Sequence, residues 1–241
     1  MMSRARYHLR ESINYNPFLF YLLFNIFGKA KQRAVTQDTD IVIEGYPRSG
    51  NSFAVAAFRR SQSNQVNIAT HVHTPCQVIK AAKLNIPTLV LIREPVSAVI
   101  SRMSLGVEVA KRKIEKGEKL RKKRYSATFS DLFKAYHKFY SCLLPIKDSF
   151  VISSFEEIIS DFSLSIARLN TRFNTNFELF DHTPENAKII IESSNFHLGP
   201  NSLRTAIKNR LYSEYYEKQN EISDKVAKAQ EIYCKFIDGV I

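Results

Sequence analysis

The sequence has no tryptophan, three cysteines, 7 glycines and 8 prolines among its 241 residues. The cysteines, Cys76, Cys142 and Cys234, are too few and too far apart for a disulfide framework or a cysteine-rich zinc site, so reduced thiols are expected. With so little glycine and proline and with 44% hydrophobic residues, the chain is neither disordered nor fibrous. Its length is that of one large domain, which can bury a sizeable core.

Long hydrophobic runs are also missing, and the most apolar stretch is Pro17–Phe27 (PFLFYLLFNIF). As a helix it would span about 16 Å, roughly half the hydrocarbon core of a bilayer. Basic residues flank it and no small-residue cleavage site follows, which argues against a signal peptide. Two interpretations stay open, a helix packed on the domain and an interfacial helix on a membrane. We therefore treat residues 1–36 as a basic, aromatic segment before a domain of residues 37–241, and expect a cytoplasmic protein with membrane association left open.

Acidic residues are outnumbered, 23 against 35 lysines and arginines, for a formal charge of +12. Such an excess favours polyanionic partners: phosphate-rich cofactors, acidic glycans or an anionic membrane. Nine of the fourteen residues of Lys111–Arg124 are basic, which is typical of a solvated helical face, with an acidic acceptor or a membrane as alternatives. No aromatic residue interrupts this run and no nucleic-acid-binding motif is present, so no nucleic acid partner is expected.

Strand and helix patterns alternate along the chain. Strands are expected at residues 39–45, 66–69, 87–92 and 149–153, and helices at 51–62, 75–84, 95–105, from the capping box Ser154–Glu157 onward, and at 213–237. This alternation predicts a three-layer α/β domain, a short parallel sheet flanked by helices with right-handed crossovers. An aromatic stripe at helical spacing between Phe129 and Tyr140 is predicted to be core.

The segment Gly45–Phe53 (GYPRSGNSF) lies where the first strand ends and a helix begins, the position at which open α/β sheets bind ligands. Gly50 permits close approach of the backbone, and amides at a helix N-terminus point toward an anion. Further donors and a fixed charge are supplied by Arg48, Ser49, Asn51 and Ser52. The segment predicts a phosphate site, although it is not GxxxxGK[ST], since the cation precedes the glycine and no lysine follows. The alternative is an ordinary junction with a solvated arginine.

A second candidate anion site involves Arg93 and Ser101. Arg93 follows the apolar strand of residues 87–92, and Ser101 comes eight residues later on the next helix. Arg93 is therefore expected at the carboxyl end of a strand, near the phosphate loop. Alone the pattern is weak, because an arginine, an acidic residue and a proline after a strand often form only a surface ion pair.

Together these motifs resemble those of the sulfotransferases that use 3′-phosphoadenosine 5′-phosphosulfate (PAPS). Tyr46–Phe53 is similar to the family's Tyr-Pro-Lys-Ser-Gly-Thr-Thr-Trp loop, and the later pair Arg93 and Ser101 follows in the same order. Two further matches are Ala69-Thr70-His71, similar to Lys-Thr-His, and Phe155-Glu156-Glu157-Ile158, similar to Tyr-Glu-Asp-Met. The resemblance covers about residues 39–160 and implies a P-loop-like α/β fold.

The resemblance also implies roles for individual residues. The loop, with Arg48, Ser49, Gly50, Asn51 and Ser52, would hold the 5′-phosphosulfate, while Arg93 and Ser101 would hold the 3′-phosphate. Rings near the adenine would be Phe53 and Phe155, where the family has tryptophan and tyrosine. Further departures are Arg48 for lysine, Ala69 for the lysine before Thr-His, and His197-Leu198-Gly199 as the counterpart of a C-terminal Arg-Lys-Gly.

The expected activity is transfer of a sulfuryl group from PAPS to an acceptor hydroxyl on a carbohydrate, a small molecule or an acidic glycan. Arg48 would stabilise charge on the bridging oxygen, and His71 would accept the hydroxyl proton, with His73 as the fallback base. No metal is expected, because His71 and His73 lack a third ligand. Two alternatives are a P-loop kinase, disfavoured by the missing lysine, and a non-catalytic module that binds polyanions or membranes.

Overall fold

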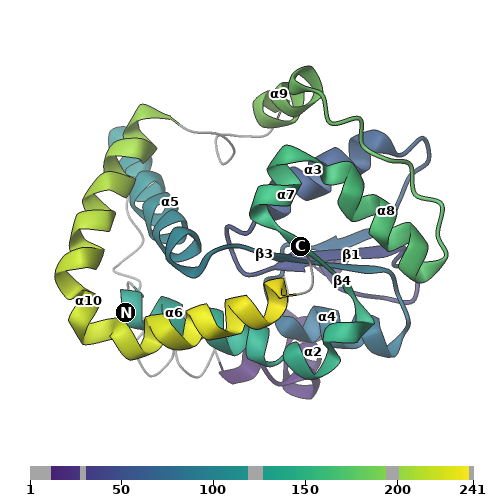
Figure 1. Ribbon diagram of the computed structural model, residues 1–241, viewed down its shortest axis with the longest axis horizontal. Helices are drawn as coiled ribbons and strands as arrows, with labels where there is room; N and C mark the ends of the chain where they lie inside the picture. Colours follow the sequence, from purple (N-terminus) through teal and green to yellow (C-terminus); the bar gives the residue numbers. More distant parts are fainter. Residues whose placement is uncertain (1–11, 28–30, 119–126, 194–200, 239–241) are drawn as a thin grey trace.

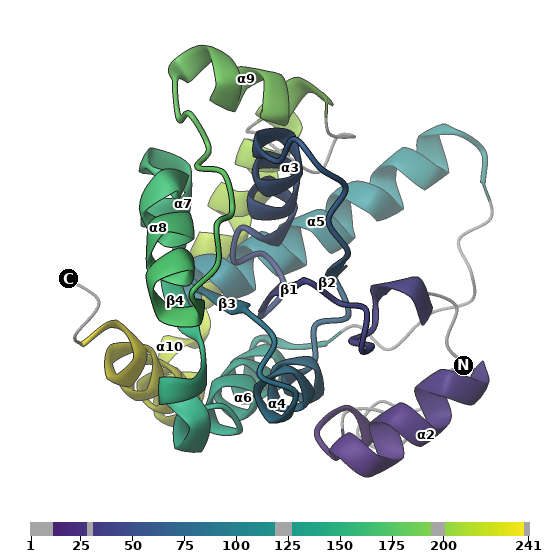
Figure 2. The same ribbon diagram turned by 90° about the vertical axis from the view of Figure 1, so that its right-hand side faces the viewer.

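The computed structural model describes residues 12–27, 31–118, 127–193 and 201–238. Its centre is a parallel sheet with the strand order β2-β1-β3-β4 (Figure 1). The strands are β1 (Ile41–Gly45), β2 (Ile68–Thr70), β3 (Thr88–Ile92) and β4 (Val151–Ser154). Helices lie on both faces of this sheet (Figures 1 and 2), so the predicted three-layer α/β architecture is confirmed.

Helices follow the strands nearly as the sequence patterns indicate. They are α2 (Pro17–Phe27), α3 (Asn51–Ser61), α4 (Pro75–Lys83), α5 (Pro95–Glu115), α6 (Phe129–Ser141), α7 (Phe155–Ser160), α8 (Phe162–Phe173), α9 (Pro184–Ser193) and α10 (Ser202–Ile237), with short 3-10 helices at Lys31–Arg33 and Leu144–Ser149. Local caps explain several starts: Thr74 caps α4, and Thr128 and Asp131 form a capping box on α6.

The two faces of the sheet bury different cores. Ile41, Ile43, Leu89 and Leu91 pack with α3, α7 and α8 on one face. Side chains of alternate residues, including Val90, pack on the other face with α5, α6 and α10. Both central strands, β1 and β3, are buried along their whole length, which explains the continuous apolar run of β3, whereas β1 also buries Glu44. The aromatic stripe of α6 is buried in the second core, as predicted.

Two helices are longer than the sequence patterns predict. α5 continues to Glu115 and not only to 105, and α10 begins at Ser202 and not at 213. The Asn201 side chain caps α10 by accepting a bond from Arg204 N, and the tertiary ion pair of Arg204 with Glu108 joins the added turns of both helices. In Figure 1 α10 runs along α5 and then bends to cross in front of α6.

The basic run Lys111–Arg124 is not one helical face. α5 ends at Glu115, and the chain then turns at Gly117, whose φ is +66°. Residues 119–124 of the run lie outside the described residues, as do His197, Leu198 and Gly199. The part in α5 is largely exposed, as a solvated face would be.

α2 packs on the domain through one side only. Phe20 is buried, and the Tyr21 hydroxyl donates to Gln77 Oε1 of α4 at 2.9 Å. Phe18, Leu19 and Leu22 are exposed on the other side, with 75% of Phe18 accessible to solvent. In the described part of the chain, every helix is too short or too polar to cross a bilayer. α2 thus combines a packed side with an exposed apolar side.

Candidate functional site

The loop after β1 turns the chain sharply into α3. Arg48 and Gly50 both have left-handed backbones, with φ of +78° and +98°. A Cβ on Gly50 would meet Ile158 at 3.3 Å and Phe155 at 3.4 Å, so glycine suits this position both for its conformation and for its size. α3 starts at Asn51, and its first turn therefore follows the glycine directly.

Buried side chains fix this loop from beneath. The Tyr140 hydroxyl of α6 accepts from Tyr46 N at 3.3 Å, donates to Leu91 O at 2.8 Å and lies 3.4 Å from Ser49 Oγ. Asn51 Nδ2 donates to Tyr46 O at 3.3 Å. Ser49 and Asn51, both predicted to hold an anion, are buried and serve the loop itself in this structure.

The structure brings four of the predicted site residues together beside the loop. Arg48 Nε donates to Ser101 Oγ at 3.1 Å, and Arg93 Nη1 donates to Arg48 O at 3.2 Å. The Arg93 guanidinium lies over the Phe155 ring, 3.8 Å from its centroid. The neighbouring Glu94 caps α5, accepting from Val96 N and Ser97 N.

Two cations of this cluster were missed in the sequence, Arg204 and Lys208 of α10. Burial, then the charges of Arg204 and Arg93, lower the pKa of Arg48 to about 10. Burial, then Arg93, Arg48 and Arg204, also lower the pKa of Lys208. Four positive charges therefore act on one another here, and such a concentration of charge favours an anion. Their spacing of four residues on a helix was the available signal, but the helix was expected to start only at 213.

Glu108 is the acidic partner of this cluster. Its carboxylate is buried and accepts from Arg204 Nε at 2.8 Å, Arg112 Nη2 at 3.0 Å and Asn201 Nδ2 at 3.2 Å. Burial raises the pKa of Glu108, but the bonds from Arg204, Asn201 and Arg112 lower it further than that, so the carboxylate is ionised at neutral pH. It anchors α10 to α5.

Two buried atoms of the site lack hydrogen-bond partners among the described residues: Asn51 Oδ1 and Arg93 Nε. A buried polar atom without a partner costs free energy, about 1–3 kcal/mol. Arg93 Nε is the donor that a bound anion would satisfy. This atom belongs to the cationic cluster at the loop.

His71 lies on the other side of the loop, directly after β2. Its Nε2 is 3.2 Å from Ser52 Oγ at the start of α3, and its Nδ1 is 3.0 Å from Thr70 Oγ1. Burial, then the charges of His73 and Arg33, lower the pKa of His71 to about 4. The imidazole is therefore neutral at pH 7 and can accept a proton at Nε2 when Nδ1 carries the hydrogen.

His73 faces a different partner. Its Nδ1 is 3.0 Å from Gly45 O, and since a carbonyl only accepts, Nδ1 carries the hydrogen. Burial chiefly lowers the pKa of His73 to about 4. The two imidazoles are 5.8 Å apart between centroids, and among the described residues no group of three or more metal-ligating side chains is assembled.

The two predicted adenine-facing rings differ in their surroundings. Phe155 lies at the loop beneath Arg93, as described above. Phe53 is only 5% exposed, and its ring contacts Phe180 and His182 in the core under α3. In this structure Phe53 is therefore a core side chain.

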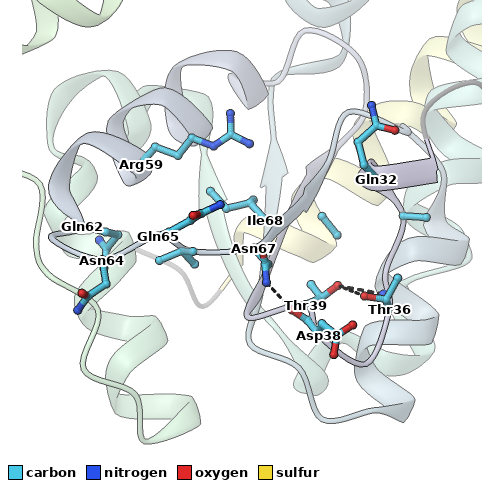
Figure 3. A pocket seen from close by; sticks show the side chains of 13 residues that line it. Gln32, Thr36, Asp38, Thr39, Arg59, Gln62, Asn64, Gln65, Asn67 and Ile68 are labelled. Carbon is cyan, nitrogen blue, oxygen red and sulfur yellow. Dashed lines mark hydrogen bonds between the residues drawn. The ribbon is translucent and has the colours of Figure 1, made fainter.

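A pocket of about 540 Å³ opens beside the edge strand β2 (Figure 3). Figure 3 shows Arg59 of α3 on one side and Gln32 on the other, with Ile68 of β2 between them. Its lining is mostly uncharged and polar, with carboxamides from Gln32, Gln62, Asn64, Gln65 and Asn67. None of the predicted site residues lines this pocket, which lies near the residues that precede β1 and β2.

No family model matches this chain, and no curated protein matches it. A solved structure of mouse sulfotransferase SULT7A1 complexed with PAP is similar over 82% of this chain and 90% of that chain, with 12% sequence identity and a TM-score of 0.44. Similarity at this level does not assign an activity to the chain.

Proposed function

We propose that this protein is a sulfotransferase that takes the sulfuryl group of PAPS to an acceptor hydroxyl. The observation that carries the proposal is the convergence of Arg48, Arg93 and Ser101 at the loop before α3. These residues come from three separate elements, and the sequence motifs name the same three. The unpartnered Arg93 Nε adds a buried donor that a phosphate or sulfate oxygen would satisfy.

The donor would be held by charge and by backbone dipoles. Amides of residues 50–52 lie at the N-terminus of α3, where the helix dipole favours an anion, and would hold the 5′-phosphosulfate, whereas Ser49 N donates to Tyr46 O at 3.2 Å. Arg93 and Ser101 would hold the 3′-phosphate, with Arg204 and Lys208 adding charge from α10. Phe155, already stacked under Arg93, offers the ring against which the adenine would pack.

Transfer then requires one proton acceptor and one stabilised leaving group. His71 Nε2 would take the proton of the acceptor hydroxyl as that oxygen forms its bond to sulfur. The bond between sulfur and the bridging oxygen breaks, and the bridging oxygen stays with the nucleotide. Arg48 would stabilise the negative charge that develops there. The Ser52 hydroxyl is hydrogen-bonded to His71 Nε2 in this structure. It would turn away from this nitrogen when the acceptor binds.

A ligand-binding measurement tests the proposal without an acceptor. Thermal unfolding would be followed with 3′-phosphoadenosine 5′-phosphate (PAP), the desulfated product, and with adenosine 5′-phosphate, which lacks the 3′-phosphate. The wild type should be stabilised more by PAP. Arg93→Ala should lose that difference, because a charge-assisted bond to the 3′-phosphate is lost only where this phosphate exists.

Arg59→Ala is the matched control, because Arg59 is an exposed arginine of α3 outside the cationic cluster. It should keep the response of the wild type. Absence of stabilisation of the wild type by millimolar PAP would contradict the proposal. Equal weakening of both nucleotides by Arg93→Ala would remove the 3′-phosphate site from it. Transfer from ³⁵S-labelled PAPS to a panel of hydroxyl compounds would then be measured with and without a magnesium chelator. Transfer that persists with the chelator distinguishes a sulfotransferase from a magnesium-dependent kinase.

A further inference from the structure

Glu44 is a fully buried carboxyl group that the proposed mechanism does not use. It is the fourth residue of β1 and has 0% solvent exposure. Its side chain points to the face of the sheet that α4 covers, where the Gln77 side chain acts to lower its pKa. A buried acid of this kind is costly unless it has a function or good partners.

The partners are the two amides of the turn that carries the histidines. Glu44 Oε1 accepts from Val72 N at 2.7 Å, and Glu44 Oε2 accepts from His73 N at 3.2 Å. The same turn has left-handed backbones at His71 and His73, with φ of +58° and +55°. Such conformations cost non-glycine residues about 1–3 kcal/mol each and persist only where their surroundings hold them.

The turn determines where His71 points. With this backbone, the imidazole leaves β2 toward α3, and its Nε2 reaches Ser52 Oγ. A relaxed extended backbone at residue 71 would send the side chain in another direction, since the conformation of the backbone sets the direction of Cβ. The carboxyl that holds the turn therefore controls the placement of the nitrogen.

We propose that Glu44 is a positioning residue, which fixes the turn of residues 71–73 through its two amides and so aims His71 Nε2 at the start of α3. Its meaning for catalysis rests on the proposed function, whereas the placement of His71 does not. Other groups that face Glu44 do not replace this role. His73 Nδ1 is 3.7 Å from Glu44 Oε2 and bonds more closely to Gly45 O, and Gln77 serves Arg33, Val35 and Tyr21 as well.

Protonation changes the strength of this hold but not its geometry. Burial raises the pKa of Glu44 to about 8, although the amides of Val72 and His73 act in the opposite direction. At neutral pH the carboxyl is then largely protonated, and both of its oxygens can still accept a bond. Ionisation above pH 8 makes the same bonds charge-assisted and stronger.

The test compares Glu44→Gln and Glu44→Ala with Asp40→Asn. Asp40 is the matched control, because it is a carboxylate at the other end of β1 that accepts from a backbone amide before β2, Asn67 N, at 2.8 Å. Hydrogen exchange of the Val72 and His73 amides and the ¹⁵N chemical shifts of the His71 imidazole would be measured in each variant. The turnover number kcat, with the best acceptor from the panel of hydroxyl compounds, and the affinity for PAP would be measured in the same variants.

In Glu44→Gln the new amide group faces His73 N, donor to donor, while the remaining oxygen can still accept from Val72 N. We therefore expect faster exchange at His73 than at Val72 and shifted His71 nitrogen signals. Glu44→Ala should loosen both amides. We expect kcat to fall roughly 10- to 100-fold with PAP affinity within about twofold of wild type, since misplacement by about 1 Å costs on the order of 10²-fold. Asp40→Asn should leave all of these unchanged.

Unchanged exchange and unchanged His71 signals in Glu44→Gln would overturn the inference, whether or not Glu44→Ala folds. A loosened turn with wild-type kcat in an active enzyme would overturn the positioning role as well. Failure of the wild type to bind PAP would contradict only the proposed function, because the magnetic-resonance measurements need no nucleotide. The two hypotheses can thus fail separately.

Discussion

The two sides of the candidate site are built in opposite ways. The loop between β1 and α3 is surrounded by positive charge from Arg48, Arg93, Arg204 and Lys208, and several elements hold it in place. The turn of residues 71–73 contains two imidazoles that burial keeps neutral. The amides of Val72 and His73 in this turn donate to one carboxyl group, that of Glu44. An anion is bound by fixed charge, whereas a histidine that accepts a proton near pH 7 must be uncharged. Placing the two on separate strands keeps these requirements apart.

The sharpest way to break this comparison is to remove His71, the proposed proton acceptor, alone. His71→Ala should lower turnover by roughly 10²–10⁴-fold, as loss of a general base does. PAP affinity should stay close to that of the wild type, because the cationic side is intact. Turnover and PAP affinity would be measured in the same preparations.

His73→Ala is the matched control for that prediction, since it lies in the same turn but bonds to Gly45 O. His73→Ala should lower turnover much less than His71→Ala does. Full activity in His71→Ala together with loss in His73→Ala would move the base by two residues. Full activity in both variants would exclude histidine from the reaction.

The cationic side can be tested through stability as well as binding. Arg204→Met should lower the free energy of unfolding by about 3 kcal/mol, because Glu108 would lose its closest buried partner. PAP binding should weaken in the same variant. Arg210→Met, in the same helix, removes an exposed pair with Glu214 and should change stability by less than about 1 kcal/mol. Denaturant unfolding measures both, and equal losses would mean that the buried network adds nothing to the fold.

The neutral side predicts an unusual dependence on pH. With a lowered pKa of about 4, His71 stays neutral at pH 5, so kcat/KM should be constant from pH 5 to 7.5. A decline centred near pH 6.5 would show an ordinary, solvated imidazole. Stability should decrease as the pH falls from 6.5 toward 4, because the unfolded chain then binds protons that the buried histidines do not. Replacing His73 by glutamine should make that decrease shallower.

The smallest effect is expected at the exposed side of α2. Phe18→Ser with Leu22→Ser should change stability by only about 0.5 kcal/mol, since both side chains are largely exposed. If this side contacts a membrane, the double variant should bind anionic vesicles more weakly than the wild type, in a sedimentation assay. Equal sedimentation of the two proteins would contradict that contact. Leu164 of α8, also exposed and outside the basic run, provides the control substitution Leu164→Ser.

Local patterns predicted most of what positions the site. β1, the loop and α3 follow from adjacent residues, because a β-branched run, a glycine and a helical apolar pattern suffice there. The sequence pattern predicts the start of α10 too late in the chain. The first turns of this helix are stabilised by the contact of Arg204 with Glu108, two residues that are distant in sequence. Glu44 could not be recognised either, since one acidic residue in a strand gives no sign of the amides that it meets.

The carboxamide of Gln77 joins parts of the chain that are otherwise separate. It accepts from the Tyr21 hydroxyl and from Val35 N, donates to Arg33 O, and acts to lower the pKa of the Glu44 carboxyl group. The N-terminal segment and the strand before the phosphate loop thus share one buried group. Binding equilibria that are linked in this way are reciprocal. If displacement of α2 changes the affinity for nucleotide by some factor, then nucleotide binding changes the equilibrium constant for displacement of α2 by the same factor.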